Sequence, residues 1–122
     1  MAKIILIVDD SNAQRMVLKM SLEGAGYDVI EARNGQEAID ILKKTSQINM
    51  IVSDVNMPVM TGLEFAQHVS TMDIHRFTPL LMLTTEYGAD KKNIAKKAGV
   101  KAWMTKPFAP SQLISAVAKL AK

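Results

Sequence analysis

Five short segments of this chain have the hydrophobic pattern of β-strands. Three of them are near-continuous apolar runs, which are typical of strands buried on both faces: residues 3–8, 50–54 and 79–84. The other two, residues 27–32 and 101–105, mix polar and apolar residues. We therefore predict a sheet with three central strands and two edge strands.

Between these strands, apolar residues recur at the three- and four-residue spacing of amphipathic helices. Three such stripes define the first, second and last helices: Ala13, Met16, Val17 and Met20; Ala38, Ile39 and Leu42; and Leu113, Ile114, Val117 and Leu120. Two further helices, over residues 63–72 and 90–98, have narrower apolar faces. Gly24 and Asn34-Gly35 lie where the pattern changes, and Pro110 suits the first turn of the last helix.

Alternation of five strands with five helices predicts an α/β fold, in which right-handed crossovers place helices on both faces of a parallel sheet. The doubly wound strand order 2-1-3-4-5 is one arrangement of this kind. With 122 residues the chain has the length of one domain, so we expect residues 1–122 to form a single unit.

The composition limits the location, the metal ligands and the classes of partner that we expect for this protein. The chain is 48% hydrophobic and 22% charged, which is typical of globular proteins, and its early apolar run is too short for a signal sequence or a membrane span. We therefore expect a cytoplasmic location. With no cysteine and two histidines, any metal would be held by oxygen. The net charge of +3 is too small to select nucleic acid, a membrane or an acidic partner.

Polar residues follow four of the predicted strands directly. They are Asp9-Asp10-Ser11 after the first, Asp54 at the end of the third, Thr84-Thr85-Glu86 at the fourth and Thr105-Lys106-Pro107 at the fifth. Because the carboxyl ends of parallel strands share one sheet edge, this pattern brings three acids, a hydroxyl and an ammonium together if the first and third strands are neighbours.

Three carboxylates in one place repel each other unless protons or a cation intervene, and oxygen ligands favour Mg²⁺. The three carboxylates, Mg²⁺ and Lys106 then sum to about zero charge. A phosphoryl group on an aspartate would add about one negative charge and new acceptor oxygens, which Thr84 and Lys106 are placed to meet. Asp54 is the better candidate nucleophile, because the vicinal pair Asp9 and Asp10 can serve the metal.

These residues carry a resemblance. The combination Asp9-Asp10-Ser11, Asp54 with Asn56-Met57-Pro58 and Gly62, Thr84, and Lys106-Pro107-Phe108 resembles the receiver domain of two-component response regulators over essentially the whole chain. Within that family, it is most similar to the single-domain chemotaxis regulators. The resemblance implies a flavodoxin-like five-stranded sheet of order 2-1-3-4-5 with five helices.

The resemblance also implies roles for individual residues. Asp54 would be the phosphoacceptor, and Asp9, Asp10, Asp54 and the main-chain carbonyl of Asn56 would hold Mg²⁺. Thr84 and Lys106 would bind the phosphoryl oxygens, and the Lys106–Pro107 peptide would be cis. Trp103 occupies the position where the family usually has Tyr or Phe, which turns inward together with the threonine, so Thr84 and Trp103 are the expected switch.

Several of these residues also have plain structural interpretations. Asp10-Ser11 could cap the first helix, Thr84 suits a strand, and Trp103 could simply cover apolar surface on an edge strand. Gly62 is expected to relieve backbone crowding, and His68 and His75 to be solvated. The densest basic cluster is either a solvated face or a surface for an acidic partner: Lys91, Lys92, Lys96, Lys97 and Lys101.

The expected function is that of a stand-alone, monomeric response regulator, most simply in chemotaxis. We do not expect an enzyme, apart from slow hydrolysis of the protein's own phosphoryl group. In the family, the residues at the positions of Asn56 and Glu86 tune the rate of that hydrolysis. Its partners would be a sensor histidine kinase and a downstream protein such as the flagellar motor switch, with neither nucleic acid nor membrane. A phosphate sink or the regulator of a non-motility target is the alternative. Three other functions are less favoured. A magnesium-dependent phosphotransferase would need an insertion that forms a substrate lid, and a nucleic-acid binder would need a platform of basic and aromatic residues; the sequence shows neither. A flavin carrier would place its phosphate where this chain has acidic residues.

Overall fold

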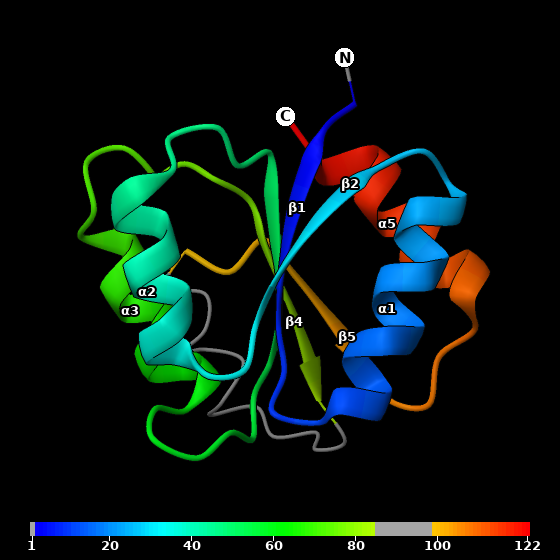
Figure 1. Ribbon diagram of the computed structural model, residues 1–122, viewed down its shortest axis with the longest axis horizontal. Helices are drawn as coiled ribbons and strands as arrows, with labels where there is room; N and C mark the ends of the chain where they lie inside the picture. The colour runs from blue at the N-terminus through cyan, green and yellow to red at the C-terminus, as the bar shows by residue number, and fades with distance from the viewer. Residues whose placement is uncertain (1, 85–98) are drawn as a thin grey trace.

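A parallel sheet of five strands forms the centre of the structure, a computed structural model that describes residues 2–84 and 99–122 (Figure 1). In the order β2-β1-β3-β4-β5 across the sheet, the strands are β1 (Ile4–Val8), β2 (Asp28–Ala32), β3 (Met50–Asp54), β4 (Leu80–Thr84) and β5 (Ala102–Thr105). This is the doubly wound, flavodoxin-like order. The predicted central and edge strands are confirmed, and their bounds agree within one residue.

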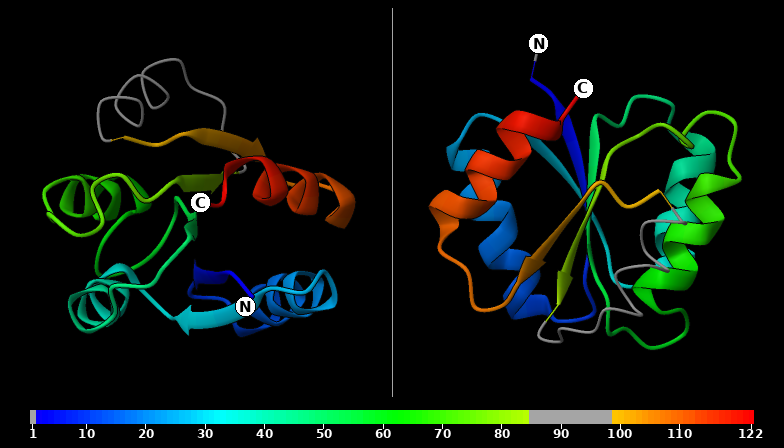
Figure 2. Two further views of the ribbon diagram at one scale, coloured as in Figure 1. Left: turned by 90° about the horizontal axis from the view of Figure 1, so that it is seen from above. Right: turned by 180° about the vertical axis from the view of Figure 1, so that it is seen from behind.

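Helices cover both faces of the sheet. α1 (Asn12–Gly24) and α5 (Pro110–Leu120) lie on one face, and α2 (Gly35–Lys44) and α3 (Gly62–Ser70) lie on the other (Figure 2). The helix predicted over residues 90–98 lies outside the described residues. None of the described helices combines the length and the hydropathy that a bilayer span requires.

Local side chains explain where the helices begin. Ser11 and Asn34 precede α1 and α2, and their side-chain oxygens accept hydrogen bonds from the third backbone N–H of each helix. The helix-cap interpretation of Ser11 is therefore confirmed. Thr61 and Glu64 form a reciprocal capping box at α3, and α5 starts at Pro110 as predicted.

The buried side chains form two cores, one on each face of the sheet. Along β1, Leu6 and Val8 belong to the core under α2 and α3, while Ile5 and Ile7 belong to the core under α1 and α5. All four are fully buried. The continuous apolar character of the central strands is therefore explained, because a strand covered on both faces has no polar side.

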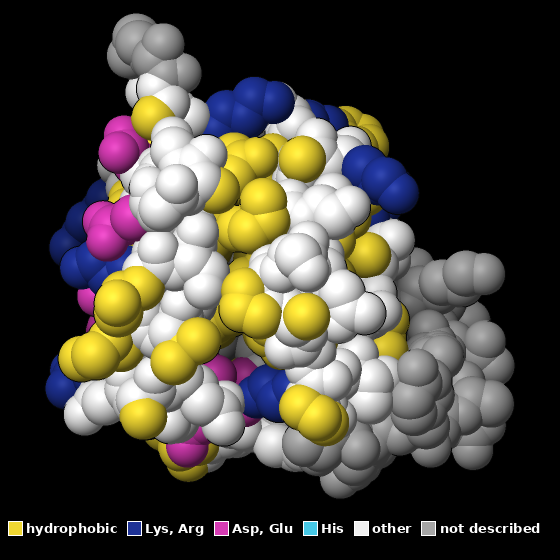
Figure 3. Space-filling model, turned by 90° about the vertical axis from the view of Figure 1, so that its right-hand side faces the viewer, with side chains coloured by type: hydrophobic (Ala, Val, Ile, Leu, Met, Phe, Trp, Pro, Cys, Tyr) yellow, Lys and Arg dark blue, Asp and Glu magenta, His cyan; other side chains and the backbone are white. Residues whose placement is uncertain are grey.

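The predicted buried face of α1 is wrong. Met16, Val17 and Met20 are 61%, 59% and 67% exposed, and the helix instead buries Leu18, Leu22 and Arg15. The face formed by α1 and α5 points toward the viewer in Figure 3, where hydrophobic side chains lie on the surface. Both stripes have helical spacing, but only the stripe with Leu18 and Leu22 faces the sheet.

Arg15 can be buried because its guanidinium is paired. Its Nη1 donates to the main-chain oxygen of Asp9 at 2.6 Å, and its Nη2 donates to the side chain of Asn12. Its Nε lies 3.5 Å from Glu31 Oε1 on β2. A charged residue therefore occupies a position that periodicity alone assigns to solvent.

The prediction that His75 is solvated is also wrong. His75 is 1% exposed, and its Nε2 lies 2.9 Å from the carbonyl oxygen of Leu42 and 2.8 Å from that of Thr45. With two carbonyl acceptors in reach, Nε2 carries the hydrogen and donates to them. The ring thus supplies a donor to the carbonyl groups that the end of α2 leaves unpaired. His68 is exposed, as predicted.

Candidate metal and phosphoacceptor site

Three carboxylates meet at the carboxyl edge of the sheet. Asp9 directly follows β1 and Asp54 ends β3, and these strands are neighbours with Val8 opposite Ser53. Asp10 follows Asp9, and one oxygen from each of the three carboxylates lies within 4.8 Å of the others. Asp9 and Asp54 are 1% and 8% exposed, whereas Asp10 is exposed. The structure brings together the acids that the strand ends predicted.

The surroundings of Asp9 disfavour its charged form, so a nearby cation would stabilise it. Burial raises the pKa of the Asp9 carboxyl, and the negative charges of Asp54 and Asp10 add to the rise. The backbone N–H of Ser11 donates to Asp9 Oδ1 at 2.9 Å, which acts in the opposite direction, as does the charge of Lys106. Asp9 Oδ2 is buried and has no hydrogen-bond partner among residues 2–84 and 99–122.

This donor set fits a hard divalent cation. Its members are carboxylate oxygens, and Asp9 Oδ2, which makes no hydrogen bond to the described residues, is available as a ligand atom. Asn56 lies in the exposed loop two residues after Asp54, and its role as a carbonyl ligand stays a prediction. The residues that the sequence assigned to magnesium are therefore compatible with it.

Lys106 is the cation that the protein itself provides. Its Nζ lies 3.4 Å from Asp54 Oδ1 and 3.8 Å from Asp9 Oδ2, and its side chain is 17% exposed. The Lys106–Pro107 peptide is cis, as expected, and the Lys106 backbone N–H donates to the carbonyl oxygen of Thr84 at 2.7 Å. The fifth strand thus places an ammonium beside the phosphoacceptor candidate.

Gln14 is a site residue that the sequence analysis missed. Its Oε1 accepts a hydrogen bond of 2.7 Å from Lys106 Nζ, the shortest contact of the ammonium among those described. The two residues are 92 positions apart. The local signal, a Ser followed three residues later by Gln, indicates only a helix cap.

The two expected switch residues lie on the neighbouring strands β4 and β5. Thr84 ends β4 and is fully buried, one residue beyond Leu83, which stands opposite Asp54. Trp103 lies on β5 opposite Met82, is half-buried and packs against the core under α2 and α3. Its Nε1 is buried and has no hydrogen-bond partner in the described part of the chain. Thr85, Glu86 and the basic cluster except Lys101 lie outside the described residues.

Gly62 lies directly against the phosphoacceptor candidate. A Cβ at this position would lie 2.3 Å from the main-chain oxygen of Asp54 and 2.8 Å from the Sδ of Met82. The Gly62 N–H donates to the carbonyl oxygen of Val55 at 2.8 Å. The predicted role of Gly62 in relieving backbone crowding is confirmed.

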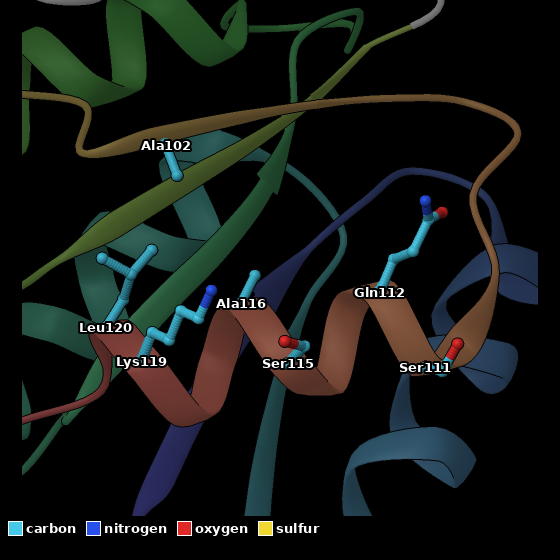
Figure 4. Close-up of a pocket in the computed structure, with 7 residues that line it drawn as sticks. All are labelled: Ala102, Ser111, Gln112, Ser115, Ala116, Lys119 and Leu120. Atoms are coloured by element: carbon cyan, nitrogen blue, oxygen red, sulfur yellow. The ribbon is translucent and has the colours of Figure 1, made fainter.

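A separate hollow lies on the outer side of α5 beside β5 (Figure 4). It has a volume of about 540 Å³ and is lined by one residue of β5 and six of α5: Ala102, Ser111, Gln112, Ser115, Ala116, Lys119 and Leu120. Small side chains on this face of α5 leave the space open. No titratable group of the acidic site lines this hollow, so it is a surface feature distinct from that site.

Fold and site together define a protein that can take up a phosphoryl group: a carboxylate nucleophile, acids for a divalent cation and an ammonium meet at one edge of a doubly wound sheet. The family model of the response regulator receiver domain matches residues 5–118. This chain belongs to the response regulator receiver domain family.

Individual relatives support the same family assignment. A chemotaxis protein CheY homolog of Campylobacter jejuni is 40% identical over 110 residues, which cover 89% of this chain and 85% of that protein. Chemotaxis protein CheY1 of Helicobacter pylori is 38% identical over 110 residues and 89% of each chain. The structure of chemotaxis protein CheY4 of Vibrio cholerae matches with a TM-score of 0.94 and 41% identity, covering 98% of this chain and 99% of that one.

Proposed function

We propose that this chain is a response regulator receiver that accepts a phosphoryl group on Asp54 from a sensor histidine kinase. The observation that carries the proposal is the meeting of three carboxylates within 4.8 Å, with Lys106 Nζ 3.4 Å from Asp54 Oδ1. Family membership and the similarity to chemotaxis regulators support it.

In the proposed reaction, a carboxylate oxygen of Asp54 attacks the phosphorus of a phosphohistidine. The P–N bond breaks, its electron pair returns to the imidazole, and an acyl phosphate forms on Asp54. Asp9, Asp10, Asp54 and the Asn56 carbonyl would hold magnesium, which supplies charge stabilisation for the transferring group. Lys106 contributes a further positive charge at the place where the charge on the phosphoryl oxygens increases.

The added charge is the proposed signal. A monoanionic carboxylate becomes a dianionic phosphoryl group, and the site then needs additional donors. Thr84 and Lys106, at the ends of β4 and β5, are the proposed donors, and Trp103 is proposed to turn inward with Thr84. Loss of the phosphoryl group to water, at a rate influenced by Asn56, would reset the protein.

The downstream partner is proposed to be a protein, as for the chemotaxis relatives, with the flagellar motor switch first. The hollow between α5 and β5 (Figure 4) offers one contact surface for such a partner, on the face of the sheet opposite the Trp103 side chain. A phosphate sink or a non-motility target is the alternative. A pull-down with the beryllofluoride-loaded chain distinguishes them, because a sink should capture only the kinase. A monomer in the cytoplasm is part of this proposal.

Treatment with acetyl phosphate and Mg²⁺ tests the phosphoacceptor. We expect intact-mass spectra to show one added phosphoryl group in the wild type and none in Asp54→Asn, because the amide is a poor nucleophile. Asp40→Asn is the matched control, since Asp40 is exposed on α2 and should leave labelling unchanged. Equal labelling of Asp54→Asn would refute the assignment.

A further inference from the structure

The first turn of α1 departs from the capping pattern of α3 and α5, in which a side chain three residues after the N-cap accepts from the N-cap backbone N–H. Ser11 and Gln14 have the sequence of a capping box, in which the Gln side chain would accept a hydrogen bond from the Ser backbone N–H. Instead, the Ser11 N–H donates to Asp9 Oδ1 at 2.9 Å. Gln14 Oε1 is thereby released from the cap and accepts from Lys106 Nζ at 2.7 Å.

The same chain shows what such a side chain does when it is used locally. At α3, Glu64 Oε1 accepts from the Thr61 N–H at 3.1 Å, and at α5, Gln112 Oε1 accepts from the Ala109 N–H at 2.8 Å. At α1 the Asp9 carboxylate takes that local role. At α1, which begins beside the acidic site, the Gln14 side chain is therefore free for a contact outside the helix.

The contact determines where the ammonium of Lys106 lies. Its distance to Gln14 Oε1, 2.7 Å, is shorter than its distances to Asp54 Oδ1 and Asp9 Oδ2, 3.4 and 3.8 Å. An ammonium has three hydrogens, so it can keep Gln14 while it donates to another group. An amide acceptor also adds no negative charge to a site that already contains three carboxylates.

We propose that Gln14 is a positioning residue, which holds the Lys106 ammonium where the phosphoryl oxygens on Asp54 require it. A free lysine side chain loses rotamer freedom when its ammonium is fixed in one place. Because Gln14 is anchored in the first turn of α1, part of that ordering is complete before the phosphoryl group arrives. The inference rests on the proposed function of Asp54.

The test is a beryllofluoride titration with Mg²⁺ in excess, which uses a phosphoryl mimic as the probe. Gln14→Met has similar length and no oxygen, and we expect it to weaken beryllofluoride affinity about three- to tenfold, the effect of one hydrogen bond. Gln14→Glu should weaken it too, because a fourth carboxylate would oppose the incoming charge. The affinity for Mg²⁺ alone should stay within about twofold of wild type in Gln14→Met, which distinguishes positioning from local damage.

Two controls make the result specific. Gln36→Met removes an exposed glutamine of α2 whose amide donates only to Asp40 of the same helix among the described residues, and it should leave beryllofluoride affinity unchanged. In a Lys106→Met background, Gln14→Met should have no further effect, because its partner is gone. Wild-type affinity in Gln14→Met, or an equal loss in the Lys106→Met background, would overturn the inference alone. Failure of the wild-type chain to bind beryllofluoride would instead overturn the proposed function.

Discussion

The burial of Asp9 lowers the stability of the metal-free protein and at the same time creates a binding site for a cation. Its carboxylate is 1% exposed, and one oxygen is satisfied by the Ser11 N–H while the other has no hydrogen-bond partner among the described residues. Burial of an anion near two other anions is unfavourable in the absence of a cation. The same arrangement favours binding of a divalent ion, so the instability and the proposed function have one source.

Replacing this charge should stabilise the metal-free protein. Because the pKa of Asp9 is raised in the folded state above its ordinary value of 3.8, its charged form lowers stability at every pH above the raised value, and this penalty disappears as the pH falls toward the ordinary value. In EDTA at neutral pH, we therefore expect Asp9→Asn to raise the free energy of unfolding. Urea unfolding at several pH values measures this, and the advantage should shrink as the pH is lowered.

With Mg²⁺ present, we expect the stability difference between the wild type and Asp9→Asn to change in the opposite direction. Adding Mg²⁺ should stabilise the wild type by mass action and stabilise Asp9→Asn much less, because a ligand is lost. A variant that gains as much from Mg²⁺ as the wild type would show that Asp9 does not contribute to the metal site.

At the scale of elements, the helix α3 begins under the phosphoacceptor loop with almost no free space. The main chains of Gly62 and Asp54 approach so closely that a Cβ on Gly62 would lie 2.3 Å from the Asp54 oxygen. The capping box of Thr61 and Glu64 keeps the helix start in that place, and its hydrogen bonds lower the pKa of Glu64. The position of Asp54 therefore depends on the position of α3.

Gly62→Ala should push these two elements apart. We expect a loss of about 2 kcal/mol or more in the free energy of unfolding, since the clash is with backbone that cannot yield without moving Asp54. Labelling of Asp54 by acetyl phosphate should slow in parallel. The matched control is Gly24→Ala at the end of α1, where a Cβ meets nothing within 4 Å. Equal stability of the two variants would contradict the close approach.

At the scale of the whole molecule, the sheet order places the acidic site beside the strands that carry the two proposed switch residues. Asp54 and Thr84 end the neighbouring strands β3 and β4, and β5 carries Trp103 beside β4. Beyond β5 lies the hollow on α5 that is proposed as a partner surface. A change at Thr84 can therefore affect Trp103 on the adjacent strand, whose side chain packs on the α2 and α3 face and not beside this hollow.

Trp103 provides an optical test of this connection, because it is the only tryptophan in the chain. We expect beryllofluoride with Mg²⁺ to change its fluorescence in the wild type and not in Asp54→Asn, since an inward turn alters the environment of the indole. Thr84→Ala should bind beryllofluoride more weakly, because a proposed donor is lost, and at saturating beryllofluoride it should still lack most of the fluorescence change. An unchanged wild-type spectrum at saturating beryllofluoride would count against Trp103 as a switch residue.

The sequence by itself determined the strands, four helices and the chemical groups at the strand ends, because apolar periodicity, caps and strand ends are local properties. It also predicted which strands are central, since burial on both faces leaves a continuous apolar run. The identities of Asp9, Asp54 and Lys106 were readable for the same reason: each directly follows or ends a predicted strand.

Only the tertiary structure decided which face of α1 is buried, how His75 is used and where Gln14 reaches. Arg15 on α1 is buried because Glu31 on β2 lies beside it. His75 is buried because α2 ends next to it. Gln14 meets Lys106 across 92 positions. Each of these contacts depends on a partner that long-range packing supplies, and no pattern within a single element specifies that partner.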